Sequence, residues 1–260
     1  MVHESATARS VVVEGAARAP RARRRDANLG RILEAATRLV ADEGLDALSM
    51  TRLAEAVDYT PGALYRYVDS KDALLSLLVQ RILDDLRAEL TTAGAALPAW
   101  SPLERIAAMI RAYRGFLARE PHRFGVLAIA LATPRVLLAT PTHAAPATAA
   151  VVATLQPLAE ALIAAAVNGQ LEPGDPVERT LALFALLHGL AQLPKLAHHL
   201  PGAFDVERLV RAGTRALLIG WGGPPATVDA ALGHAPHPSR ARPAATTGAR
   251  PKATSARRSS

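Results

Sequence analysis

The residues best suited to chemistry lie in one short stretch that combines small, basic and aromatic side chains. Gly62, Ala63 and Arg66 fall on one side of a predicted helix. Leu64 and Val68, four residues apart, fall on the other side. Small side chains let a helix approach base edges closely, and an arginine can donate two hydrogen bonds to guanine. The stretch therefore favours contact with the major groove of DNA.

Two short predicted helices position these side chains. The first, Met50–Val57, follows Ser49, which is a good N-cap residue. A three-residue break separates it from the second helix, Pro61–Val68, where Thr60 can cap and proline suits the first helical position. A short helix, a tight break and a second short helix are typical of a helix-turn-helix, whose second helix enters the major groove.

Longer apolar stripes predict further helices on both sides of this motif. The chain lacks the strand-type alternation of β-branched and aromatic residues, and only 4% of its residues are aromatic, so the predicted fold is all-α. The expected further helices are Asp26–Glu43, Lys71–Leu90, Ser101–Arg119, Pro121–Leu131, Ala147–Val167, Asp175–His198 and Val206–Ile219, with a loop at Pro134–Pro146.

The landmarks of the first four predicted helices occur at characteristic spacing. They are Ile32-Leu-Glu-Ala-Ala36, Gly44, Leu53-Ala-Glu-Ala56, Thr60-Pro-Gly-Ala-Leu-Tyr-Arg-Tyr-Val68, and Ser70-Lys71 followed by Leu74-Leu75. Together they resemble the N-terminal domain of the tetracycline-repressor (TetR) family. The resemblance implies an all-helical homodimer, in which a three-helix helix-turn-helix head joins a helical body that binds a ligand and dimerises. The family often has glycine and an aliphatic residue where this chain has Asp58 and Tyr59, and aspartate tolerates left-handed backbone geometry.

The resemblance also implies roles for individual residues. The predicted DNA-binding residues are Thr51, Thr60, Gly62, Ala63, Tyr65, Arg66, Tyr67 and Lys71. The two tyrosines and the lysine match phosphate contacts, and a lysine at a helix N-terminus suits a phosphate. Gly62, Ala63 and Arg66 are the candidates for reading bases, while the threonines could serve either purpose. Alternatively, the tyrosines only pack the motif and Arg66 is a solvated surface residue.

The basic excess lies wholly at the two ends of the chain. The formal net charge is +7, but residues 1–25 carry +4 and residues 221–260 carry +5, whereas residues 26–90 carry −5. We expect a disordered basic arm at 1–25, a TetR-type DNA-binding domain at 26–90, a regulatory and dimerisation domain at 100–220, and a disordered basic tail at 221–260. The arginines that precede the first helix predict an arm that supplies much of the DNA affinity.

The second half of the chain carries a weaker resemblance. The segments Arg111–Phe124 and Leu186–Leu190 resemble a WHG-type C-terminal regulatory domain, with an aliphatic residue or Phe184 at the tryptophan-like position. His188 could line a ligand cavity or be a satisfied core histidine. The leucines of the helices at 177–193 and 206–219 could form either a dimer interface or the core. Tyr113, Arg114, Gln156 and Asn168 are further candidate pocket groups.

Several classes of protein are disfavoured. The chain has no cysteine, which excludes disulfides, thiolate zinc sites and cysteine nucleophiles. A metal site at His188, His198 and His199 lacks a matched carboxylate, so we expect no metal and no cofactor. No apolar run reaches the length of a membrane span, and the N-terminus does not resemble a signal peptide, so we expect a cytoplasmic protein. The common motifs of enzymes are absent, which argues against an enzyme on a helical scaffold.

The expected function is a ligand-responsive transcriptional regulator, and specifically a repressor. Its partners would be double-stranded DNA at a palindromic operator, an unknown small-molecule effector and a second copy of the chain. The alternative is a helical protein–protein interaction module whose head has impaired DNA binding, because the head is acidic and its turn is unusual.

Overall fold

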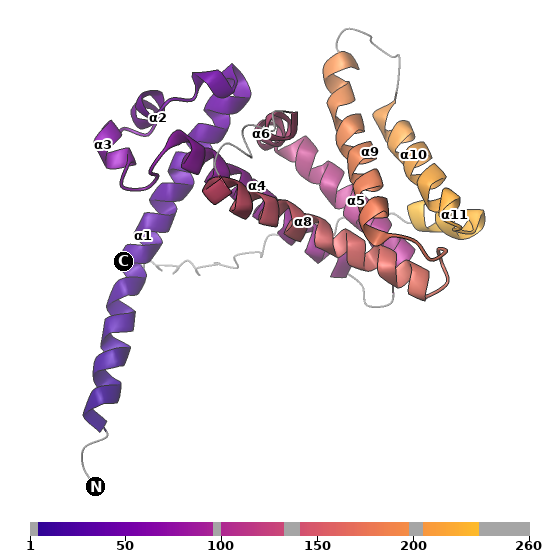
Figure 1. Ribbon diagram of the computed structural model, residues 1–260, viewed down its shortest axis with the longest axis horizontal. Helices are drawn as coiled ribbons and strands as arrows, with labels where there is room; N and C mark the ends of the chain where they lie inside the picture. The colour runs from indigo at the N-terminus through magenta and orange to yellow at the C-terminus, as the bar shows by residue number, and fades with distance from the viewer. Residues whose placement is uncertain (1–4, 96–99, 133–140, 198–204, 234–260) are drawn as a thin grey trace, which may run out of the picture.

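The computed structural model describes residues 5–95, 100–132, 141–197 and 205–233. In these ranges every regular element is a helix, which confirms the all-α prediction (Figure 1). The helices are α1 (Ser5–Glu43), a short 3-10 turn η1 (Leu45–Ala47), α2 (Met50–Ala56), α3 (Pro61–Leu64), α4 (Lys71–Ala95), α5 (Pro102–Arg119), α6 (Pro121–Ala132), α8 (Pro141–Val167), α9 (Pro176–Ala197), α10 (Val206–Gly220) and α11 (Pro225–Gly233).

The head is built from the second half of α1, helices α2 and α3, and the start of α4. Its centre contains Ile32, Leu53, Leu64 and Leu74, which are all completely buried. Full burial of each such side chain stabilises the fold by about 1.5–3 kcal/mol. The predicted apolar stripes therefore meet in one core, which fixes α3 against α1 and α4.

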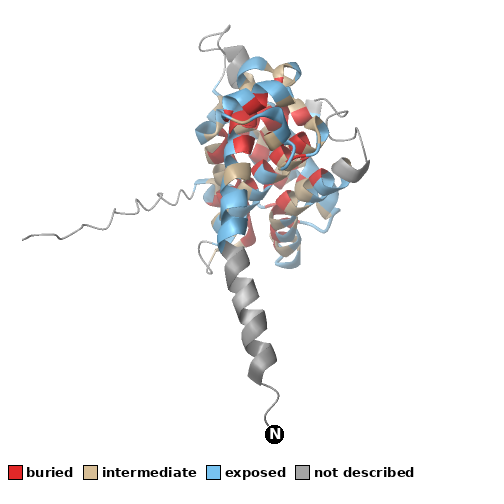
Figure 2. Ribbon diagram, turned by 90° about the vertical axis from the view of Figure 1, so that its left-hand side faces the viewer, coloured by how far each residue is buried: buried red, intermediate tan, exposed pale blue. Residues whose placement is uncertain are grey.

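The body is a bundle in which α4, α5, α8 and α9 pack around a second part of the same core. Helix α4 contacts both α1 and α8, so it joins the head to the body. Helices α9 and α10 lie side by side and α11 packs on α5 and α10 (Figure 1). Buried residues gather where the helices cross, whereas the described end of α1 that leaves the head is exposed (Figure 2).

Four helix starts follow the predicted caps. The Ser49 side chain accepts a hydrogen bond from the Arg52 amide, and Ser101 and Glu104 form a reciprocal capping box. The Thr60 hydroxyl caps α3, and the Asp205 carboxylate accepts bonds from two amides at the start of α10. Such caps satisfy donors that would otherwise lack a partner at a helix N-terminus.

The N-terminal region differs from the predicted arm. Helix α1 begins at Ser5 and continues through Pro20, whereas the sequence predicted disorder at 1–25 and a helix start at Asp26. That prediction relied on the lack of an apolar stripe before residue 26. A helix that projects beyond the core needs no such stripe, and alanine and arginine are among the strongest helix formers.

The C-terminal tail also differs in part. Helix α11 forms within the segment 221–260, which the sequence predicted to be disordered. Its apolar side chains pack against the body and hold it there. Val228 is completely buried and Ala231 nearly so. Arg215 and Asp229 form a two-bond ion pair that joins α10 to α11, with N···O distances of 2.6 and 3.0 Å. The rest of the tail lies outside the described residues.

Helix α8 is longer and more apolar than expected. It begins at Pro141, so the second half of the predicted loop Pro134–Pro146 is helical, while residues 133–140 lie outside the described residues. Its segment Ala144–Val167 is long and apolar enough to cross a membrane by length and composition, with 28% of the window buried. Length and composition alone are weak evidence, because Leu158 and Leu162 are buried in the core of the body.

Candidate nucleic-acid interface

The helix-turn-helix is present, but its second helix is shorter than predicted. Regular α3 ends at Leu64, and Tyr65–Tyr67 continue as turns rather than as helix to Val68. The Tyr67 and Val68 amides both donate to the Leu64 carbonyl, at 2.9 and 3.2 Å. The buried side chains of Leu64 and Val68 still hold this segment against the head.

The turn between α2 and α3 depends on Asp58. Its φ is +59°, and it is the only non-glycine residue with a positive φ in the described part of the chain. This geometry lets the Tyr59 amide donate to the Ala54 carbonyl at 2.8 Å, which reverses the chain direction. Aspartate therefore replaces the glycine of the family pattern by adopting the left-handed conformation.

We expect Asp58→Val to lower the free energy of unfolding by about 1–2 kcal/mol, since a β-branched residue is strained at this φ. Asp58→Gly is expected to keep or raise it, by up to about 1 kcal/mol. Denaturant unfolding followed by circular dichroism measures both values. The control is Asp46→Val, an exposed aspartate that does not share the positive φ. Equal losses at Asp58 and Asp46 would contradict the argument.

Most of the predicted DNA-binding residues lie on the outside of the motif. Gly62, Arg66, Thr51 and Thr60 are exposed, Tyr65 is 48% exposed, and Ala63 is half-buried. The Thr60 hydroxyl also caps α3 by accepting from the Ala63 amide at 3.2 Å. A hydroxyl that accepts this bond still has its own proton to donate.

Tyr67 lies at the centre of a group that sequence reasoning did not find. The aromatic cluster consists of Arg25, Asn28, Tyr59 and Tyr67. The Asn28 amide donates to the Tyr67 hydroxyl at 3.1 Å, and the rings of Tyr59 and Tyr67 stack with centroids 6.0 Å apart. The Arg25 guanidinium lies 5.8 Å from the Tyr67 ring centroid. Burial, and then the hydrogen bond to Tyr67, raise the pKa of Tyr59.

This cluster connects α1 to the turn that follows α3. Two of its four members, Arg25 and Asn28, come from α1 where it enters the head, and they contact a ring 39 or more residues away in sequence. Packing is therefore one role of Tyr67, as the alternative interpretation held. The same contacts place the exposed arginines of α1 beside the recognition segment.

Lys71 has a structural partner at the start of α4. Its Nζ donates to the Leu45 carbonyl at 3.0 Å, which ties the loop after α1 to α4. The side chain is half-buried. An ammonium group has three donors, and this contact uses one. The lysine can hold this loop and still meet a phosphate at the helix N-terminus.

The acidic residues that lie outside the motif have basic neighbours. Each of five carboxylates is within 3.3 Å of a basic nitrogen, three of them with groups of the body. The pairs are Asp42–His122, Glu43–Arg52, Asp84–Arg87, Asp85–Arg123 and Glu89–Arg119. Exposed pairs add little stability. The four pairs with arginine reduce the negative field locally in a head whose net charge is −5.

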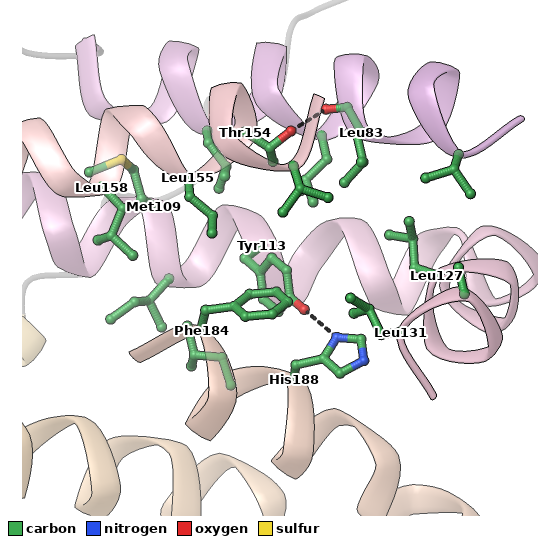
Figure 3. Close-up of a pocket in the computed structure, with 17 residues that line it drawn as sticks. Leu83, Met109, Tyr113, Leu127, Leu131, Thr154, Leu155, Leu158, Phe184 and His188 are labelled. Carbon is green, nitrogen blue, oxygen red and sulfur yellow. Dashed lines mark hydrogen bonds between the residues drawn. The ribbon is translucent and has the colours of Figure 1, made fainter. Parts of the chain in front are cut away.

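A cavity lies in the body between α4, α5, α6, α8 and α9. Its walls are almost entirely apolar (Figure 3). The Tyr113 hydroxyl lies 3.0 Å from His188 Nδ1, and this pair reaches the cavity from α5 and α9 (Figure 3). Burial strongly raises the pKa of Tyr113. The structure thus brings together two of the candidate pocket groups, 75 residues apart in sequence.

The other candidate pocket groups lie elsewhere. Gln156 bonds to Glu160 and lines a separate cleft of α4, α5 and α8. Arg114 forms an ion pair with Glu207, and Asn168 is exposed at the end of α8. His198 and His199 lie outside the described residues. In the described ranges no three His, Asp or Glu residues are grouped so that they could hold a metal ion.

Comparisons with known proteins agree with this architecture. The family described as "Bacterial regulatory proteins, tetR family" matches residues 32–78, and the one described as "Tetracyclin repressor-like, C-terminal domain" matches residues 106–217. The HTH-type transcriptional regulator Rv1816 of Mycobacterium tuberculosis H37Rv is 33% identical over 108 residues, which are 40% of this chain and 46% of that protein. The match therefore spans less than half the length of that relative.

Solved structures share the fold over most of the chain. The TetR family regulator PfmR of Thermus thermophilus superposes with a TM-score of 0.56 at 21% identity, over 73% of this chain and 97% of PfmR. AibR, solved with isovaleryl coenzyme A and operator DNA, gives a TM-score of 0.55 at 23% identity, over 71% of this chain and 95% of AibR. The first description matches across the helix-turn-helix and the second across most of the body that holds the cavity, so the chain belongs to the TetR family of transcriptional regulators.

Proposed function

We propose that this regulator is a repressor that binds a palindromic operator as a homodimer and releases it when a small molecule enters the body. The observation that carries the proposal is the exposed surface of Gly62, Tyr65 and Arg66 over the buried Leu64. The DNA-binding domain is residues 26–90, and the regulatory and dimerisation domain is residues 100–220, which α11 extends. Its place of action is the cytoplasm, where the DNA lies.

The head would contact DNA in two ways. Gly62 and Ala63 would bring the start of α3 close to base edges, where Arg66 can donate two bonds to guanine. Tyr65, Tyr67 and Lys71 would meet phosphates, with Thr51 and Thr60 as further hydroxyl donors. Support comes from the outward position of most of these side chains and from the rigid packing beneath them.

Selection of bound sites from random DNA, followed by measured affinities, tests this proposal. Arg66→Ala is expected to cost about 1–3 kcal/mol against the preferred site and to relax the preference at one position per half-site. Tyr65→Phe removes only a phosphate contact, so it should weaken binding equally for all sequences. Arg87→Ala, an exposed arginine of α4 paired with Asp84, is the matched control.

Two other outcomes would count against the proposal. No enrichment of any DNA sequence would favour the alternative, a helical interaction module with impaired DNA binding. An unchanged sequence preference in Arg66→Ala would instead contradict the role of that side chain while leaving DNA binding intact.

The proposed dimer interface is the outer face of α9 and α10. Val177, Leu181, Ala185 and Gly189 follow one another at every fourth residue of α9, and all are exposed. Val177 is 63% exposed and Leu181 51%, which is unusual for side chains of this size. By contrast, Leu183 is completely buried and belongs to the core. A two-fold dimer uses the same face of both copies, and it would place the recognition helices on two half-sites about 34–36 Å apart.

In the proposed response, ligand binding acts on the head through the helices that form the walls of the cavity. Helices α4 and α6 line the cavity and also contact α1 of the head. Arg123, in the first turns of α6, lies 2.9 Å from Asp85 of α4 and 3.8 Å from Glu34 of α1. A ligand that moves either wall would therefore shift the population between two arrangements of the head. The AibR structure, which has a similar fold, holds both a small molecule and operator DNA, so this fold can accommodate both kinds of partner.

A further inference from the structure

The cavity of the body offers an occupant almost no polar surface. Its five helices present mainly Leu, Val, Ala, Met and Phe side chains (Figure 3). None of the residues that line it is Asp, Glu, Lys or Arg. An ionised group placed there would lose its water without gaining a fixed counter-charge, which is very unfavourable.

The wall of the cavity has few groups that can donate a hydrogen bond to an occupant. The Thr154 hydroxyl uses its one proton on backbone, since its Oγ1 lies 2.8 Å from the Ala150 carbonyl and 3.1 Å from the Leu83 carbonyl, so toward an occupant it can only accept. The remaining polar atoms belong to Tyr113 and His188, which bond to each other across the wall at 3.0 Å. Two phenyl rings, of Phe124 and Phe184, lie with centroids 5.4 Å from that of the His188 ring.

The hydroxyl of Tyr113 decides what this pair can bind. Burial raises the pKa of the Tyr113 hydroxyl, so it stays protonated at physiological pH. When the His188 Nδ1–H donates to the phenol oxygen, the phenol proton is available for a carbonyl oxygen; when the phenol donates to Nδ1, its oxygen can accept from an alcohol. A carbonyl or hydroxyl oxygen satisfies it without bringing a charge into the cavity.

We propose that the cavity takes an uncharged ligand with an apolar body and a single oxygen function, such as an alcohol, ketone or ester, whose oxygen binds the Tyr113–His188 pair. This inference rests on the proposed ligand response and specifies the chemical class of the effector. Carboxylates and amines are expected to be poor ligands, because both are ionised near neutral pH.

The size of the cavity indicates that binding also changes its shape. The volume of the cavity is about 60 Å³. For comparison, an apolar cavity of about 150 Å³ in another protein binds benzene. A ligand with a ten-carbon chain must therefore push the walls apart, and two of these walls are α4 and α6, which contact α1.

The test uses three probes of equal chain length, decan-1-ol, decanoate and decylamine, with the full-length protein at pH 7.5. Direct binding is measured by calorimetry, and release from a selected operator is measured separately. Decan-1-ol is expected to bind at least about 30-fold more tightly than either ionised probe, since neither finds a counter-charge. Equal or tighter binding of decanoate or decylamine would overturn the proposal, and so would failure of all three to bind.

Two variants locate the ligand. Tyr113→Phe removes only a hydroxyl and is expected to weaken decan-1-ol binding about 3- to 10-fold while leaving binding of decane unchanged. Ala130→Leu fills space at the wall from α6, where Ala130 is 2% exposed, and should weaken both probes. Thermal unfolding confirms that each variant is folded. An unchanged affinity of Tyr113→Phe for decan-1-ol would overturn the role of the pair.

The two readouts separate this inference from the proposed function. Tight binding of decan-1-ol without any release of DNA would contradict the proposed ligand response but support the chemical class of the cavity. Release of DNA by decanoate with no effect of decan-1-ol would support a ligand response and overturn the class.

Discussion

Leu181→Arg is expected to convert the dimer into a monomer and to lower operator affinity by about 1,000-fold or more, because a dimer engages two half-sites at once. Leu181 is 51% exposed in the middle of the small and apolar stripe on α9. Two arginines facing each other across a two-fold axis would repel one another and leave their charges desolvated. Sedimentation velocity gives the oligomeric state, and retardation of operator DNA gives the affinity.

The control for this experiment is Val152→Arg on α8. Val152 is 65% exposed, so the arginine is equally well solvated there, but it lies outside the stripe of α9 and α10. We expect this variant to remain dimeric and to bind the operator normally. A dimeric Leu181→Arg protein, or a monomeric Val152→Arg protein, would place the interface on a different face.

The features predicted correctly from sequence are those set by local interactions. Ser49, Thr60, Ser101 and Asp205 cap helices because a cap requires only a side chain and amides two or three residues later. The helix-turn-helix could also be located from sequence, because its family landmarks are short motifs of neighbouring residues. The aspartate at position 58, where the family often has glycine, could also be explained from local sequence, since aspartate is one of the few residues that adopts a positive φ.

The features missed from sequence depend on pairs that are distant along the chain. Asn28 bonds to Tyr67 over 39 residues, and Lys71 bonds to the Leu45 carbonyl over 26. An asparagine or a lysine does not indicate by its type which distant residue it will contact, so no sequence pattern could identify these two hydrogen bonds. Tyr113 and His188 were each predicted as pocket candidates from sequence. Only the packing of α5 against α9 shows that they form one hydrogen-bonded pair.

Helix α1 was predicted too short for a different reason. The sequence analysis equated a missing apolar stripe with disorder, although a stripe is required only where a helix is buried. Beyond the head, α1 carries exposed arginines at positions 21, 23, 24 and 25. The arm that was expected to bind DNA as a disordered segment is therefore part of a helix, and Arg25 anchors it to Tyr67.

This geometry changes how the arm would act on DNA. A helix anchored beside the recognition segment presents its arginines at fixed positions, so those on the side that faces DNA can meet a phosphate without the entropy cost of ordering a loose chain. The head itself carries −5, so the arginines of α1 would supply much of the positive charge next to DNA. The affinity should accordingly depend on this short segment rather than on the total charge of the chain.

Replacing Arg21, Arg23 and Arg24 together with glutamine is expected to reduce the slope of log affinity against log salt by about 0.9 for each of them that contacts a phosphate, and so by at most about 2.7. If the affinities of the variant and the wild type converge at about 1 M salt, the loss at about 0.1 M lies between about 8-fold and about 500-fold. Arg25 is kept because it contacts Tyr67. Glutamine retains helix propensity, so α1 should stay helical.

A matched control separates position from net charge. Replacing the arginines at 240, 242 and 250 with glutamine removes the same charge from the C-terminal tail. If position on α1 matters, this control is expected to keep the salt slope of the wild type. Equal slopes for all three proteins would show that α1 makes no phosphate contacts. Equal reductions in both variants would show that the arginines act through net charge alone.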